Sequence, residues 1–130
     1  PRSDHFENIY YAPHSEFPDT ESILLLADIM VCDWSSIAFD FLLLDRPTIF
    51  LDVPHPFKKG LSLDASYRFG KVVADQNEMI EALELYLQNP EAYFSAYQQK
   101  SNEFKRIIYD ATADGKVGER SCKRLSQLMR

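Results

Sequence analysis

The sequence has little cysteine and no long apolar segment. Its two cysteines, Cys32 and Cys122, are spaced like neither a metal site nor a disulfide framework, which favours a reducing cytoplasm. The longest apolar runs, 23–27 and 41–44, are far shorter than the roughly 20 residues that span a bilayer. No signal peptide is recognisable at Pro1. We therefore expect a soluble, cytoplasmic protein.

Basic residues are also scarce. Lysine and arginine total 14 against 20 acidic residues, which gives a formal net charge of -6. Nucleic-acid binding depends on clustered basic side chains that release counterions from the phosphate backbone. The charge balance therefore excludes a nucleic-acid-binding surface, and a bound phosphate group must be held by a local arrangement of donors.

The composition is otherwise that of a folded domain. Of 130 residues, 45% are hydrophobic and 13% aromatic, which is enough to form a core. No internal repeat or low-complexity tract interrupts the chain. We expect a single domain over 1–130.

The first part of the chain alternates predicted strands and helices. Residues 7–12 are rich in Ile and Tyr and predict a short strand that ends at a proline. A helix capped by Asp19 or Thr20 should run to about Ala27. The continuous apolar run 29–32 predicts a strand that is buried on both faces of a parallel sheet.

The middle of the chain predicts a helix, a strand and a long loop. Apolar residues recur at helical spacing over 35–44, and Pro47 must end that helix soon after Asp45. A strand is predicted at 48–51. The stretch 53–70 contains prolines and glycines without a clean period, so we interpret it as a long irregular loop of the kind that is often functional.

The last part of the chain is mostly helical. Residues 71–74 predict one more short strand, and Asp75 with Glu78 resembles a capping box at the start of the next helix. Pro90 suits the first position of a helix. Three helices are predicted here, over 79–87, 90–109 and 118–129. The order of elements indicates an α/β fold with a mostly parallel sheet of about four strands, fewer than the about five or six of doubly wound domains. We expect the first strands of the domain to lie outside this chain.

The segment 33–36, Asp-Trp-Ser-Ser, follows a predicted strand and precedes a predicted helix. Parallel sheets bind ligands at the carboxyl ends of their strands, where helix N-termini offer unpaired amide groups. The hydroxyls of Ser35 and Ser36, together with the amides of 36–38, predict a site for a diphosphate. The alternative is that Ser35 is only the N-cap of the helix, and the two roles do not exclude each other.

Asp40 lies about one turn into the same predicted helix, between two phenylalanines. A carboxylate there can accept hydrogen bonds from a ribose hydroxyl pair while the phosphates lie at the helix tip. The alternative is a solvated or ion-paired helix residue.

Two segments resemble a known family. Residues 27–41 read Ala-Asp-Ile-Met-Val-Cys-Asp-Trp-Ser-Ser-Ile-Ala-Phe-Asp-Phe, and 46–50 read Arg-Pro-Thr-Ile-Phe. They resemble the CDP-glycerol glycerophosphotransferase family, whose pattern is a strand ending in Asp-Tyr-Ser-Ser, then Phe-Asp-Phe, then Arg-Pro and another strand. Trp34 stands where the family usually has Tyr. Weaker matches at 70–73 and 114–120 extend the resemblance over most of the chain.

The resemblance implies a two-domain, GT-B-like transferase with a Rossmann-like C-terminal domain that binds a nucleotide-diphosphate donor. Residues 1–130 would form the C-terminal part of that domain, with Ser35 and Ser36 on the donor phosphates and Asp40 on the ribose. The implied reaction moves glycerol phosphate, or a related polyol phosphate, from CDP-glycerol or a similar donor to a polymer or lipid-linked acceptor of the cell envelope, as in teichoic acid biosynthesis.

The acceptor would bind through an N-terminal domain outside this chain, so the fragment alone should be inactive. No cofactor is implied. The full-length protein is expected in the cytoplasm, and peripheral association with the inner face of the cell membrane is left open.

Two other functions remain open. A nucleotide-sugar glycosyltransferase or a UDP-sugar 2-epimerase-like domain uses the same arrangement, although such epimerases usually present glycines in place of Ser35 and Ser36. A non-catalytic nucleotide-binding or interaction module is the third interpretation. In the long loop, Lys58 and Lys59 could close over a donor or an anionic lipid, with a solvated loop as the alternative.

No catalytic residue and no metal site are predicted. The histidine motif that the family carries upstream does not match the surroundings of His5, His14 or His55. Asp110 begins a segment that resembles a calcium loop, but Ser121 stands at the twelfth position, where a bidentate Glu is required.

Overall fold

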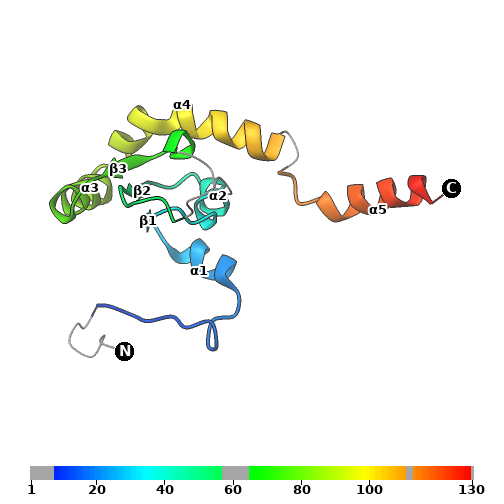
Figure 1. Cartoon of the computed structure of the whole chain (residues 1–130), viewed down its shortest axis with the longest axis horizontal. Helices are drawn as coiled ribbons and strands as arrows, with labels where there is room; N and C mark the ends of the chain where they lie inside the picture. Colours follow the sequence, from blue (N-terminus) through cyan, green and yellow to red (C-terminus); the bar gives the residue numbers. More distant parts are fainter. Residues whose placement is uncertain (1–7, 57–64, 111–112, 130) are drawn as a thin grey trace.

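The computed structural model describes residues 8–56, 65–110 and 113–129. Three strands, β1 (Met30–Cys32), β2 (Thr48–Leu51) and β3 (Lys71–Val73), form a parallel sheet in the order β1-β2-β3 (Figure 1). Helices pack against both faces of this sheet. The predicted α/β class, with a parallel sheet and flanking helices, is confirmed for the described residues.

All five predicted helices are present. Their bounds are α1 (Thr20–Leu26), α2 (Ile37–Leu42), α3 (Gln76–Gln88), α4 (Pro90–Tyr109) and α5 (Val117–Leu128), with a short 3-10 helix, η1 (Ala65–Tyr67), before β3. α2 ends three residues before the predicted end at Asp45. Asp45 has a φ of 53°, in the left-handed region, so the right-handed helix cannot continue through it.

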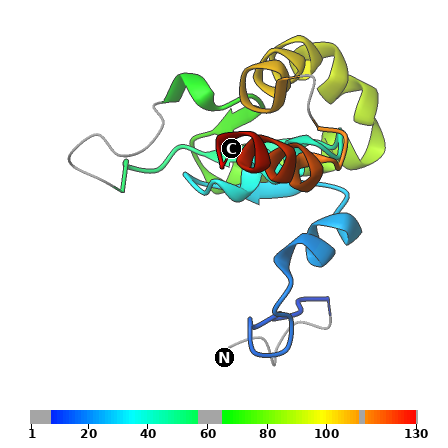
Figure 2. The same cartoon turned by 90° about the vertical axis from the view of Figure 1, so that its right-hand side faces the viewer.

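The predicted strand at 7–12 is wrong where the structure describes it, from residue 8 onward. These residues extend away from the sheet (Figures 1 and 2) and form no strand. Tyr10 is 87% exposed. Strand propensity reflects the fit of a side chain to a half-buried pleated surface, and no such surface lies beside this segment. The sheet therefore has three described strands instead of about four.

The sheet is buried on both faces only at its centre. In β2, Ile49 packs on the face covered by α3 and α4, and Phe50 packs on the opposite face beneath α2. Val31 of β1 is paired with Ile49 and shares its face, yet it is exposed. The prediction that β1 is buried on both faces is therefore wrong, because α3 and α4 cover only the β2 and β3 side.

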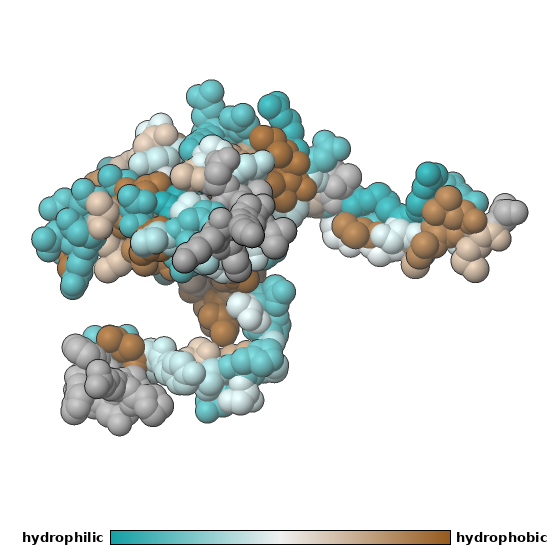
Figure 3. All heavy atoms as spheres, viewed as in Figure 1, coloured by the Kyte–Doolittle hydropathy of each residue, from teal (hydrophilic) through white to brown (hydrophobic). Residues whose placement is uncertain are grey.

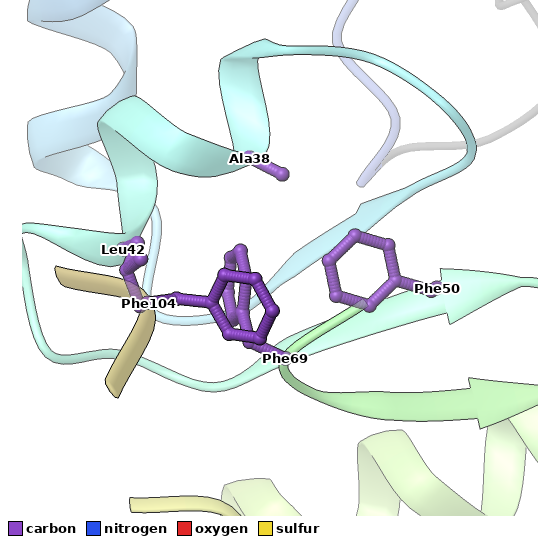
Figure 4. Packing of buried hydrophobic residues seen from close by; sticks show 5 residues of the cluster. All are labelled: Ala38, Leu42, Phe50, Phe69 and Phe104. Atoms are coloured by element: carbon purple, nitrogen blue, oxygen red, sulfur yellow. The ribbon is translucent and has the colours of Figure 1, made fainter. Parts of the chain in front are cut away.

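The face beneath α2 carries an aromatic cluster (Figure 4). It consists of Ala38, Leu42, Phe50, Phe69 and Phe104. The rings of Phe69 and Phe50 meet edge to face, with centroids 5.2 Å apart. Because Phe69 precedes β3 and Phe104 comes from α4, the cluster joins both α4 and the segment before β3 to α2.

The predicted cap of α3 by Asp75 is confirmed, and Glu78 takes part in it through the residue before the N-cap instead of the N-cap itself. The Asp75 carboxylate accepts hydrogen bonds from the amides of Asn77 at 2.8 Å and Glu78 at 3.0 Å. The Glu78 carboxylate accepts one from the amide of Ala74 at 2.9 Å. α3 consequently begins at Gln76, three residues before the predicted start, and the Pro90 start of α4 is as predicted.

α5 projects away from the body of the molecule and has no buried residue (Figure 1). Hydrophilic side chains cover much of the visible surface of α3 and α4, whereas apolar side chains lie open on α5 (Figure 3). Within the described ranges, no helix is both long enough and apolar enough to cross a membrane.

Gly70 should be intolerant of a side chain. A Cβ there would collide with the backbone carbonyl oxygen of Thr48 and lie 3.0 Å from the Tyr93 hydroxyl. We expect Gly70→Ala to lower the free energy of unfolding by about 1–3 kcal/mol, the usual cost of overpacking. Urea unfolding followed by circular dichroism measures this. Gly118→Ala is the matched control, because no atom lies within 4 Å of its Cβ position. An equal effect of both changes would contradict the close approach at Gly70.

Candidate functional site

The turn after β1 exposes two serines whose hydroxyls are unused. The Asp33 carboxylate accepts a hydrogen bond from the Ser35 amide at 3.2 Å, and this bond shapes the turn. The N-cap of α2 is Ser36, and it makes no side-chain capping bond. The alternative that Ser35 is the N-cap is therefore wrong. Neither serine hydroxyl bonds another described residue, so both can donate to a ligand.

The backbone of this turn offers fewer free donors than predicted. The Ala38 amide donates to the Ser35 carbonyl at 3.3 Å, so it is not free. The amides of Ser36 and Ile37 have no acceptor within the described part of the chain. α2 also has only six residues, which limits what its dipole can contribute to anion binding.

Asp40 is exposed on α2, one turn beyond Ser36. Positions four apart lie on the same face of a helix, so the two side chains share a face. Asp40 also approaches Tyr109, the last residue of α4. The pKa of the Tyr109 phenol is raised, first by burial and secondly by the negative charge of the Asp40 carboxylate. The structure thus places Ser35 and Ser36 at the start of α2 and Asp40 one turn further along the same helix.

No sequence pattern predicted a buried arginine at this site. Arg68 lies between η1 and β3 and is only 5% exposed. Its Nη1 lies 3.2 Å from a carboxylate oxygen of Asp52, which follows β2. Its guanidinium carbon lies 4.0 Å from the ring centroid of Trp34. Its Nε and Nη2 are buried and have no hydrogen-bond partner among the described residues.

Trp34 ties the turn after β1 to the segment after β2. Its indole Nε1 donates to the Val53 carbonyl at 3.0 Å, and its ring lies 4.6 Å from that of His55. The indole N–H of Trp34, which stands where the resembled family usually has Tyr, thus has a local structural use. The structure therefore places His55 beside the site, although no catalytic role follows from ring contact alone.

Cys32 is the last residue of β1 and lies half-buried below the turn. Burial, followed by the neighbouring Asp33 carboxylate, raises the pKa of its thiol to about 12 against the opposing effect of the Arg68 charge. The thiol therefore stays protonated at neutral pH and is a poor nucleophile. Cys32 therefore lines the site without acting as a nucleophile.

A separate hollow of about 360 Å³ opens at the opposite edge of the sheet. Its lining includes Asp28 and Ile29 before β1, Pro47 before β2, and Tyr86 near the end of α3. Parallel sheets bind ligands at the carboxyl ends of their strands, whereas this hollow lies at the amino ends. We therefore place the candidate site at the turn after β1.

Comparison with known proteins decides the family. The CDP-glycerol:poly(glycerophosphate) glycerophosphotransferase family matches residues 2–127. The chain belongs to this family. The resemblance inferred from segments 27–41 and 46–50 is thereby confirmed.

A curated relative of this glycerophosphotransferase-family chain is the teichoic acid glycerol-phosphate transferase of Staphylococcus aureus (strain NCTC 8325 / PS 47). The two are 29% identical over 114 residues, which cover 84% of this chain and 28% of that protein. The chain thus spans little more than a quarter of that relative's length. No solved structure matches the chain.

Two motif residues of the glycerophosphotransferase pattern have structural roles. Arg46 donates through Nη1 to the carbonyls of Leu25 at 2.8 Å and Ala27 at 2.7 Å, which satisfies the C-terminal end of α1. Asp114 accepts two hydrogen bonds from Arg120, at 2.6 and 2.8 Å, and these bonds lower the pKa of its carboxyl. Asp114 is therefore already paired at the segment that resembled a calcium loop.

Several residues considered in the sequence analysis fall beyond what the structure describes, namely His5, Lys58 and Lys59. His14 lies in the irregular segment before α1. In the ranges 8–56, 65–110 and 113–129, no group of three or more His, Cys, Asp or Glu side chains is arranged to hold a metal ion.

The two cysteines should differ in reactivity. Cys122 on α5 is exposed, whereas burial keeps the Cys32 thiol protonated. We expect iodoacetamide at pH 8 to modify Cys122 of the native protein well before Cys32, and both at similar rates after denaturation in urea. Peptide mass spectrometry over a time course measures the two rates. Equal rates in the native protein would show that the end of β1 is open to solvent.

Proposed function

We propose that the full-length protein transfers glycerol phosphate, or a related polyol phosphate, from a CDP-activated donor to a polymer or lipid-linked acceptor of the cell envelope. Residues 1–130 would form the C-terminal part of the donor-binding domain of a GT-B-like enzyme that works in the cytoplasm, at the inner face of the membrane. Membership of the family and the name of the Staphylococcus aureus relative support this proposal.

One observation carries the donor-binding role. After the carboxyl end of β1, the hydroxyls of Ser35 and Ser36 are exposed at the start of α2, and the carboxylate of Asp40 is exposed one turn further along the helix. A diphosphate needs donors and a ribose needs acceptors, and these residues offer both. Asp33 rather than Ser35 shapes the turn, so the serines remain available.

The transfer itself is a phosphoryl displacement. An acceptor hydroxyl oxygen forms a bond to the phosphorus that carries the glycerol, the bond from that phosphorus to the CMP oxygen breaks, and the hydroxyl proton passes to a base. Donors placed around the diphosphate stabilise the charge that gathers on its oxygens. In this proposal the residues at the turn bind and orient the donor, and no residue of this chain is assigned as the base.

Loss of both serine hydroxyls should weaken donor binding. We expect Ser35→Ala with Ser36→Ala in the full-length enzyme to weaken CDP-glycerol binding by about 1–3 kcal/mol, the usual cost of losing hydrogen bonds to a charged group. Isothermal titration calorimetry measures the affinity. Ser95→Ala, an exposed serine of α4, is the matched control and should bind as the wild type. Unchanged affinity in the double variant would remove the phosphate role from the serine pair.

Asp40→Asn tests the ribose contact separately. This near-isosteric change should weaken CDP and UDP alike, because both carry the same ribose, and should leave pyrophosphate affinity almost unchanged. Calorimetry with the three ligands provides the comparison, and Glu84→Gln on α3 is a matched control for charge. Equal losses for pyrophosphate and CDP would indicate damage to the turn instead. No loss for any ligand would place Asp40 outside the site.

A further inference from the structure

The site has a buried cation that its hydrogen bonds do not fully satisfy. A guanidinium keeps its charge even when buried, and each of its N–H groups needs an acceptor. In Arg68, the Nε and Nη2 donors lack one among the described residues, although the side chain is 95% covered. A buried arginine that only supported the fold would normally have its donors matched.

The ion pair between Arg68 and Asp52 is weak. The distance from Nη1 to Asp52 is 3.2 Å, longer than the about 2.7–2.9 Å of a good charge-assisted hydrogen bond. It engages one nitrogen instead of forming a two-point fork. The Asp52 side chain is 64% exposed, so it lies on the solvent side of the guanidinium and can turn away into water.

Trp34 contacts this cation through its ring. The guanidinium carbon lies over the ring, 4.0 Å from the centroid, and this cation–π contact does not supply the acceptors that Nε and Nη2 lack. Trp34 is also the residue before Ser35, so the cation contacts the turn that carries the two serines. The opposing effect of Arg68 on the Cys32 pKa shows that its charge is felt at the end of β1.

We propose that Arg68 binds a phosphate group of a nucleoside diphosphate, which takes the place of the Asp52 carboxylate. This inference rests on the proposed donor-binding function and adds the positive charge that the serine pair lacks. A phosphate presents several acceptor oxygens and more negative charge than a carboxylate, so it can engage Nη1 together with a donor that is now unmatched. In this structure the Asp52 carboxylate occupies the position proposed for the phosphate.

The test measures the affinity of the full-length protein for cytidine, CMP and CDP by isothermal titration calorimetry. We expect Arg68→Lys, which keeps the charge and loses the fork, to weaken CDP binding by roughly 10-fold or more, CMP binding less, and cytidine binding hardly at all. Arg106→Lys, an exposed arginine of α4, is the matched control and should change none of the three.

Asp52→Asn provides a test in the opposite direction, and it stands even if the Arg68 variant fails to fold. Asp52 is mostly exposed, so the fold should persist, and loss of the competing carboxylate should tighten CDP binding severalfold without changing cytidine binding. Thermal unfolding of each variant confirms that it is folded.

The outcomes separate the two proposals. If the wild type fails to bind CDP, the proposed function fails. If the wild type binds CDP and Ser35→Ala with Ser36→Ala weakens it, the function stands. In that case, either of two results would overturn the phosphate-binding role of Arg68 and leave it as a support for Trp34. One is a ratio of CDP affinity to cytidine affinity that Arg68→Lys leaves unchanged. The other is an Asp52→Asn variant that binds CDP no more tightly than the wild type.

Discussion

The close approach of Gly70 to the carbonyl of Thr48 is the constraint on which the candidate site depends. It lets the chain enter β3 against the start of β2, so that Phe69 reaches Phe50 and Phe104 in the cluster beneath α2. Arg68 directly precedes Phe69 and Gly70, which are both fixed by these contacts, and it is thereby held against the ring of Trp34. The position of the cation is therefore a consequence of core packing.

The chain places a polar site at the edge of a strongly aromatic core. Parallel pairing aligns the ends of β1 and β2, and the indole hydrogen bond from Trp34 to Val53 joins the two segments that leave them. Asp33 and Asp52 follow these strands and carry negative charge. The positive charge of the buried Arg68 partly offsets it. The protein as a whole is acidic, with a net charge of -6, so its affinity for an anion must come from such local arrangements.

Membership of the glycerophosphotransferase family gives the turn a chemical context, and the structure shows which motif residues are free to act in it. Arg46 of the Arg-Pro pair is used by the end of α1, and Asp114 is used by Arg120. By comparison, the side chains of Ser35, Ser36 and Asp40 are exposed and make no hydrogen bond to another described residue. A family motif thus mixes residues that build the scaffold with residues that can meet a ligand, and hydrogen-bond partners separate the two groups.

Local signals in the sequence determined most of the secondary structure and part of the site. The Asp75 and Glu78 cap, Pro90 at a helix start and the apolar run before Asp33 act through neighbouring residues, so they could be predicted from the chain alone. The serine pair and Asp40 could be proposed for the same reason. Only the tertiary structure decided that Tyr10 has no strand to pair with, that Val31 is open to solvent, and that Arg68 is buried between Trp34 and Asp52. Strand pairing, burial and the desolvation of a charge depend on residues distant in sequence, and no local pattern records which of them will meet.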